Sequence, residues 1–233
     1  WQVHPDSVAV LKQGTHRSLK MDNVLAYIPG KRSDEYVIVG AHFDHLGVDE
    51  TLADDKIYNG ADDNASGVSA VLQIFALSGE KPLRNVIFAF WDGEEKGLLG
   101  SKHFVQHCPF LKQIKGYLNF DMIGRNSKPE QPQHVVYFYT AAHPAFGEWL
   151  KRDITRYGLQ LQPDYRPWDN PVGGSDNASF ARSGIPVIWY HTDGHPDYHQ
   201  PSDHADRINW DKVVDITKAS FLNMWYMANE KDF

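Results

Sequence analysis

Short apolar runs along this chain alternate with segments in which apolar residues recur at every third or fourth position. Short continuous runs are typical of buried strands, and the second pattern is typical of helices with one buried face. Strands are predicted at residues 23–28, 36–39, 85–90, 117–120, 135–139 and 187–190. Helices are predicted between residues 64 and 79, and at about 98–107, 146–158, 175–183 and 209–228. Because strands and helices alternate, we predict an α/β fold, a single domain over residues 1–233 whose mixed, mostly parallel β-sheet is flanked by helices on both faces.

The remaining segments are predicted to be irregular. Residues 1–20 form a poorly patterned lead-in, 46–60 are rich in Asp, 160–174 are rich in Pro, Trp and Gly, and 191–206 carry four histidines. In the helix that follows Asp63 and Asn64, either of which could cap it, the predicted buried face consists of Val68, Val71, Leu72 and Phe75. Asn209 is predicted to cap the last helix.

The composition narrows the class of protein. Among the 233 residues, 42% are apolar and 13% are aromatic, which is enough for a sizeable core and argues against disorder. The net charge of −7 gives no support to nucleic-acid binding. Cys108 is the only cysteine, which excludes an intrachain disulfide and a cysteine-based zinc site. No apolar run approaches the ~20 residues that span a bilayer.

Two adjacent glutamates follow the most apolar strand. The run from Val86 to Phe90 ends at Asp92-Gly93, and Glu94 and Glu95 come next. Neighbouring residues of a non-helical segment point in different directions, so one carboxylate could hold a cation while the other handles a proton. For an isolated Glu-Glu pair, a solvated acidic turn would be the alternative.

Other imidazole and carboxylate groups occupy equivalent positions. The residues just after a predicted strand, or in the loop beyond it, are His42, Glu94, Glu95, Asp121 and His199. The carboxyl ends of parallel strands line one crevice, and Asp62 or Asp63 could reach it from the start of a helix. Such ligands suit zinc, and also manganese or cobalt. Their number exceeds what one catalytic zinc needs, and two metals ~3.5–4 Å apart that share a bridging carboxylate would account for the surplus.

Five motifs in order carry a family resemblance. They are residues 41–44 (AHFD), 60–67 (GADDNASG), 91–95 (WDGEE), 119–124 (NFDMIG) and 198–203 (YHQPSD). In this pattern the chain resembles the co-catalytic zinc aminopeptidases, whose relatives include glutamate carboxypeptidase-like peptidases and glutaminyl cyclases. The resemblance implies a zinc exopeptidase-like fold, and an exported protein because many bacterial relatives are secreted or periplasmic.

The resemblance also implies two zinc ions per chain and five ligands, which are His42, Asp63, Glu95, Asp121 and His199. His42 and Asp121 would hold one ion, Glu95 and His199 the other, and Asp63 would bridge them. Asp62 is the alternative bridge. Only the Tyr-His-x-Pro-x-Asp context selects His199 among its neighbours His191, His195 and His204.

Three further roles follow from the resemblance. Glu94 would act as the general base on a metal-bridging water, Asp44 would orient the ring of His42, and Tyr198 would donate a hydrogen bond to the oxyanion. The expected substrates are peptides with a free N-terminus, cleaved at the N-terminal peptide bond. Tyr165, Trp168 and the turn at 173–176 could shape the substrate pocket.

Several alternatives remain open. A carboxypeptidase of the same fold would need a cation for the substrate carboxylate, which Arg125, Arg166 or Arg182 could supply. A glutaminyl cyclase with a single zinc is opposed by His42. A binding protein with decayed ligands is opposed by the complete ligand set, and a serine hydrolase by the lack of a Gly-x-Ser-x-Gly motif. The histidines His103, His107, His134 and His143 are expected at the surface or in packing, and the oligomeric state is left open.

Overall fold

A seven-stranded sheet lies at the centre of the computed structural model, which describes residues 8–12, 15–32, 34–168 and 173–233. Its strands are β3 (Val24–Ile28), β4 (Tyr36–His42), β7 (Asn85–Trp91), β8 (Ile114–Phe120), β9 (His134–Thr140), β10 (Gln162–Trp168) and β11 (Val187–His191). Across the sheet they follow the order β10-β9-β11-β8-β4-β7-β3. β11, β8, β4 and β7 run parallel, β9 is antiparallel to β11, and β3 is antiparallel to β7. The predicted mixed, mostly parallel sheet is therefore confirmed.

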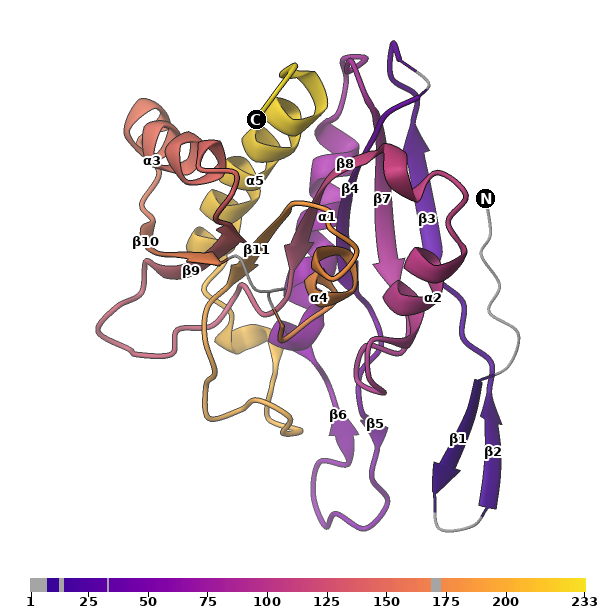
Figure 1. Ribbon diagram of the computed structural model, residues 1–233. Coiled ribbons are helices and arrows are strands. Elements are labelled where there is room, and N and C mark those ends of the chain that lie inside the picture. The colour runs from indigo at the N-terminus through magenta and orange to yellow at the C-terminus, as the bar shows by residue number, and fades with distance from the viewer. Residues whose placement is uncertain (1–7, 13–14, 33, 169–172) are drawn as a thin grey trace.

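Helices cover both faces of the sheet, as predicted (Figure 1). One face packs against α1 (Gly67–Leu77), α3 (Ala145–Tyr157) and α5 (Trp210–Asn229), and the other against α2 (Leu99–His107) and α4 (Asn177–Ala181). The apolar run of β4 is continuous because its residues point alternately into the cores on the two faces of the sheet. Val37 and Val39 point into the first core, Ile38 points into the second, and all three are fully buried.

The prediction of a loop over residues 160–174 was wrong for β10, while residues 169–172 lie outside the described part of the chain. β10 is an edge strand that pairs only with β9. Gln162 donates its N–H to Gln133 on the paired side. Successive residues of a strand direct their backbone nitrogens to opposite edges. The nitrogens of Pro163 and Pro167 therefore face the unpaired edge, where no N–H donor is needed. Two prolines therefore fit this strand although they would break a central one.

The predicted buried face of α1 was also wrong in part. Val71 is fully buried, but Leu72 and Phe75 are 52% and 41% exposed. The helix instead turns Gly67 and Ala70 toward the sheet. A Cβ at Gly67 would lie 3.0 Å from the Phe120 side chain, so the absence of a side chain permits this close approach. Gly67 and Ala70 carry little apolar signal, so the prediction shifted toward Leu72 and Phe75, and it also passed over the fully buried Ile74.

Short strands occur in two segments predicted to be irregular. β1 (Val8–Lys12) pairs with β2 (Thr15–Leu19) in the lead-in, of which residues 1–7 and 13–14 lie outside the described structure. β5 (Gly47–Val48) pairs with β6 (Ile57–Tyr58) inside the Asp-rich segment. Within the described residues, every helix is too short or too polar to cross a membrane.

Candidate metal centre and active site

The candidate residues lie at the carboxyl ends of the central parallel strands. His42 is the last residue of β4, Asp121 follows β8, and Glu94 and Glu95 lie just beyond β7. Asp63 belongs to the turn Ala61–Ser66 that precedes α1, and His199 belongs to the segment between β11 and α5. The fold thus brings together residues that are far apart in the sequence.

Two groups of possible metal donors share Asp63. In the first, His42 Nε2 lies 3.3 Å from Asp63 Oδ1 and 3.6 Å from Asp121 Oδ1. In the second, His199 Nε2 lies 3.2 Å from Asp63 Oδ2 and 3.2 Å from Glu95 Oε2. The two oxygens of Asp63 therefore face different groups, which is the geometry that a bridging carboxylate needs.

The donor spacing and the charges both fit zinc. Donors about 2.0–2.2 Å from one tetrahedral zinc ion are about 3.3 Å from each other, close to the distances between these side chains. Burial, and then repulsion from Asp121, raises the pKa of Glu94 to about 9. Burial also raises the pKa of Asp63, although the His42 ring opposes that shift. A divalent cation would relieve this crowding of buried carboxyl groups.

Asp62, the alternative bridge, is engaged elsewhere. Its Oδ1 accepts hydrogen bonds from the Gly124 N–H at 2.6 Å and from the Ser66 hydroxyl, and its Oδ2 lies 3.2 Å from His195 Nε2. Asp203 accepts the backbone N–H groups of Asp62 and Asp63 at 2.9 and 3.2 Å. This contact ties the turn before α1 to the segment that carries His199.

Asn64, one of the two predicted cap residues, accepts hydrogen bonds from the N–H groups of Gly67 and Met122, both at 3.2 Å. Its amide also donates to the Phe120 carbonyl. Asn64 therefore joins the start of α1 to the end of β8, which positions Asp63 relative to Asp121.

Asp44 holds the two glutamates in place. Its carboxylate accepts the backbone N–H of Glu94 at 2.9 Å and that of Glu95 at 3.2 Å. His42 Nδ1 is 3.2 Å from the Asp44 backbone oxygen and 3.7 Å from its carboxylate. Asp44 thus lies beside the His42 ring, with its backbone oxygen nearer to the ring than its carboxylate.

A cavity of about 300 Å³ opens beside the donors. Its lining residues are Asp63, Glu94, Glu95, Asp121, Met122, Gly174, Trp189, His191, Gly194 and Tyr198. Burial, supported by the neighbouring carboxylates, raises the pKa of Tyr198 to about 12, so its hydroxyl keeps its proton and can donate. Gly174 fits the predicted pocket turn, but Tyr165 and Trp168 are absent from the lining.

The sequence reasoning missed three residues of this region. His45 Nδ1 lies 2.7 Å from Glu95 Oε1 and 3.8 Å from Asp63 Oδ2. His191 Nδ1 lies 2.6 Å from the Asp121 backbone oxygen, and the Trp189 ring packs beside it at 4.9 Å. The available signal for His45 was its place three residues after His42, directly beyond a strand.

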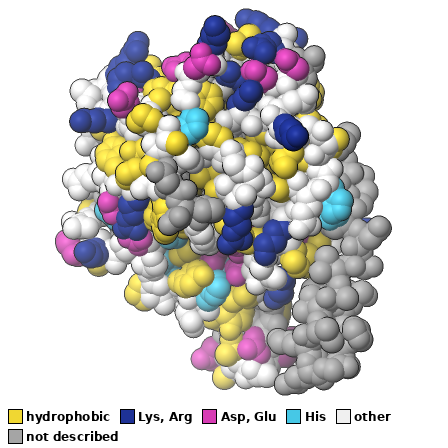
Figure 2. Space-filling model, in the orientation of Figure 1, with side chains coloured by type: hydrophobic (Ala, Val, Ile, Leu, Met, Phe, Trp, Pro, Cys, Tyr) yellow, Lys and Arg dark blue, Asp and Glu magenta, His cyan; other side chains and the backbone are white. Residues whose placement is uncertain are grey.

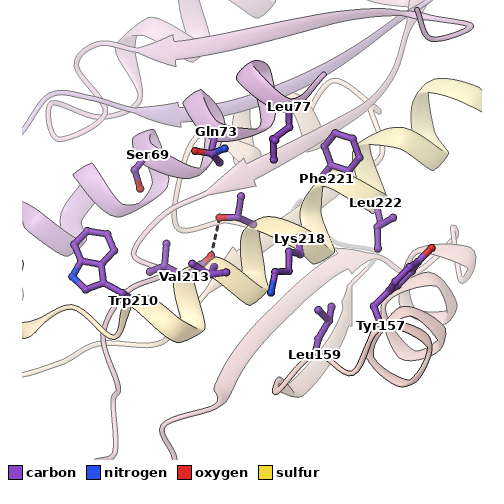
Figure 3. A pocket seen from close by; sticks show the side chains of 12 residues that line it. Ser69, Gln73, Leu77, Tyr157, Leu159, Trp210, Val213, Lys218, Phe221 and Leu222 are labelled. Atoms are coloured by element: carbon purple, nitrogen blue, oxygen red, sulfur yellow. Dashed lines mark hydrogen bonds between the residues drawn. The ribbon is translucent and has the colours of Figure 1, made fainter. Parts of the chain in front are cut away.

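A larger groove, of about 720 Å³, runs between α1 and α5 (Figure 3). Apolar side chains of both helices line it, among them Leu77, Trp210 and Phe221. The candidate metal donors are absent from its lining, so its size does not make it the active site. Figure 2 shows a face on which side chains of both charges are interspersed among hydrophobic ones.

Comparison with known proteins agrees with this geometry. Residues 23–223 match the model of peptidase family M28. Leupeptin-inactivating enzyme 1 of Streptomyces exfoliatus is 31% identical over 170 residues, which cover 71% of this chain and 34% of the relative. The probable lipoprotein aminopeptidase LpqL of Mycobacterium tuberculosis is 39% identical over 230 residues, which cover 83% of this chain and 43% of the relative.

Among solved structures, the LapA aminopeptidase of Legionella pneumophila superposes with a TM-score of 0.73 at 25% identity, covering 97% of this chain and 59% of LapA. The chain therefore spans between about a third and three-fifths of the length of these relatives. The predicted resemblance to aminopeptidases and the predicted fold are confirmed. The family match covers most of the chain and includes every candidate donor, so this chain belongs to peptidase family M28.

Proposed function

We propose that this chain is a zinc-dependent aminopeptidase that hydrolyses the N-terminal peptide bond of peptides. The observation that carries the proposal is that the two carboxylate oxygens of Asp63 face two separate groups of donors. His42 and Asp121 would hold one zinc ion with Asp63. Glu95 and His199 would hold a second, and His45 lies beside them. When bound, zinc lowers the pKa of water toward ~7 and polarises a carbonyl group.

The residues around the donors supply the proton transfers. Glu94 lines the cavity, and Asp44 fixes its backbone. The carboxyl group of Glu94 takes a proton from the attacking water and returns that proton to the leaving amine. The Tyr198 hydroxyl, also in the cavity lining, donates a hydrogen bond to the oxygen that gains negative charge.

Among the described residues, the cavity offers no cationic partner for a substrate carboxylate. Asp63, Glu94, Glu95 and Asp121 line it, and the described lining contains no Lys or Arg. Two bound zinc ions would offset the charge of these four carboxyl groups, so it is the missing cationic side chain that disfavours a carboxypeptidase.

The arginines that a carboxypeptidase would need are engaged or remote. Arg125 pairs with Asp197 at 2.6 Å, and Arg166 pairs with Asp164 at 2.6 Å. Arg182 is exposed beyond the end of α4 and does not line the cavity. The structure therefore favours the aminopeptidase over the carboxypeptidase. The name of the Mycobacterium tuberculosis relative, a lipoprotein aminopeptidase, supports an extracytoplasmic location for this chain as well.

Metal content and turnover on a small panel of substrates test the proposal together. Zinc per chain is counted, and aminoacyl-anilides, N-blocked peptides with free carboxyl ends, and glutaminyl peptides are offered. We expect two zinc ions and cleavage of free-amine substrates alone. Cleavage of N-blocked peptides alone would assign a carboxypeptidase, and one zinc with ring closure of glutaminyl peptides would assign a cyclase.

A further inference from the structure

The ring of His45 lies against the second donor group without belonging to the predicted ligand set. Its side chain is 10% exposed, and its Nδ1 lies 2.7 Å from Glu95 Oε1. A Cβ at Gly60 would come within 2.9 Å of the ring, and Tyr58 packs near it with the ring centroids 6.5 Å apart. The imidazole is therefore held in a fixed position beside Glu95.

Distances separate a metal ligand from a hydrogen-bond partner at this place. Two donors of one tetrahedral zinc lie about 3.3 Å apart, and His199 Nε2 satisfies this at 3.2 Å from both Glu95 and Asp63. His45 does not, because 2.7 Å to Glu95 is the length of a charge-assisted hydrogen bond and 3.8 Å to Asp63 is long.

The two oxygens of Glu95 consequently have different neighbours. Oε1 faces His45, and Oε2 faces His199. The backbone N–H of Glu95 is held separately by Asp44. His45 and Asp44 together restrain the side chain and the main chain of this one residue.

We propose that His45 is a positioning residue for the second zinc ion, whose Nδ1–H donates to Glu95 Oε1 and leaves Oε2 as the single oxygen that binds the metal. This inference rests on the proposed function. Hydrogen bonds to metal-bound carboxylates fix the orientation of the ligand, and their loss typically costs about 10- to 100-fold in metal affinity.

The test measures zinc affinity directly, by competition between the metal-free protein and a chromophoric chelator. For His45→Ala we expect the second zinc to bind about 10- to 100-fold more weakly, with the first zinc unchanged. His45→Asn restores part of the affinity, because its amide N–H can donate to the same oxygen. His143→Ala, which removes a histidine whose partner is the Phe233 backbone oxygen, serves as the control and binds both ions like the wild type.

Cobalt substitution separates a positioning residue from a ligand. At saturating cobalt, His45→Ala should keep the absorption spectrum of the wild type, whereas His199→Ala should change it because a ligand is lost. A spectrum altered as in His199→Ala, with no rescue by Asn, would overturn the proposal by making His45 a ligand. If His45→Ala binds zinc with wild-type affinity, the proposal for His45 is overturned. The proposed function still stands in that case, provided that the wild type binds two zinc ions. A wild type that binds one zinc overturns both.

Discussion

Glu94 is the residue on which the proposed reaction depends most directly. Glu94→Gln keeps the shape of the side chain but cannot take a proton, so we expect kcat to fall roughly 100- to 10,000-fold. Zinc content should stay at the wild-type value because Glu94 is not a proposed ligand. Steady-state kinetics and metal analysis on the same sample check both statements. Retention of half the activity would assign the proton transfer to another group.

Cys108 gives a prediction that is independent of the metal centre. Burial raises the pKa of its thiol to about 11. The thiolate is the reactive form, so at pH 8 alkylation should run about 100-fold slower than for a thiol of pKa near 9. The rate should keep rising about tenfold per pH unit through pH 10. Because the chain has one cysteine, the rate of iodoacetamide labelling is read from the peptide that carries Cys108, apart from any alkylation of lysine or histidine. A rate that levels off near pH 9 would contradict the burial argument.

At the residue scale, the sequence indicated which candidate donors lie together better than it indicated the residues that support them. His42 and Asp121 end or follow buried strands, and the topology alone brings such positions together. His45 was missed because it lies in irregular chain, where no periodicity indicates which way a side chain points. The direct link from Asp203 to the Asp63 backbone was not predicted for the same reason, since it joins two loops.

At the scale of elements, the cap of α5 was predicted and can be tested by substitution. The Asn209 side chain accepts the N–H of Lys212, and its amide donates to Asn126 and to the Pro132 carbonyl. For Asn209→Ala we expect the free energy of unfolding to fall by about 1–2 kcal/mol, measured by urea denaturation. Asn209→Asp keeps the acceptor and loses the two donors, so it separates the cap from the other contacts. No loss in Asn209→Ala would show that the cap is not used.

Elements with strong apolar runs were predicted well. An element such as β10, which is a strand only because it pairs with the edge of the sheet, was not. β4 and β7 are buried on both faces, which only a continuous apolar run permits. β10 contains two prolines and none of its residues is buried, so nothing local distinguishes it from a loop. It is a strand because β9 offers a free edge, and that is a property of the tertiary fold.

For the whole molecule, the buried carboxyl groups make stability depend on the metal. Asp63, Glu94, Glu95 and Asp121 share one cavity, and a bound divalent cation would offset the crowding of their carboxyl groups. We expect chelation to lower Tm and added zinc to restore it. The gain is about 2.7 kcal/mol for each site at a free zinc concentration of 100 times Kd. Calorimetry of the chelated and reloaded protein measures the difference, and an unchanged Tm would argue against a metal at this centre.

The contact between Asp203 and Asp62 closes a loop of 141 residues, and this has a consequence for biosynthesis. The donors of the first group all lie before residue 122, at the end of β4, in the turn before α1 and just after β8. The second group has to wait for residue 199 and for the segment that Asp203 secures. In the proposed ligand set, the second group of donors is therefore completed later during synthesis than the first.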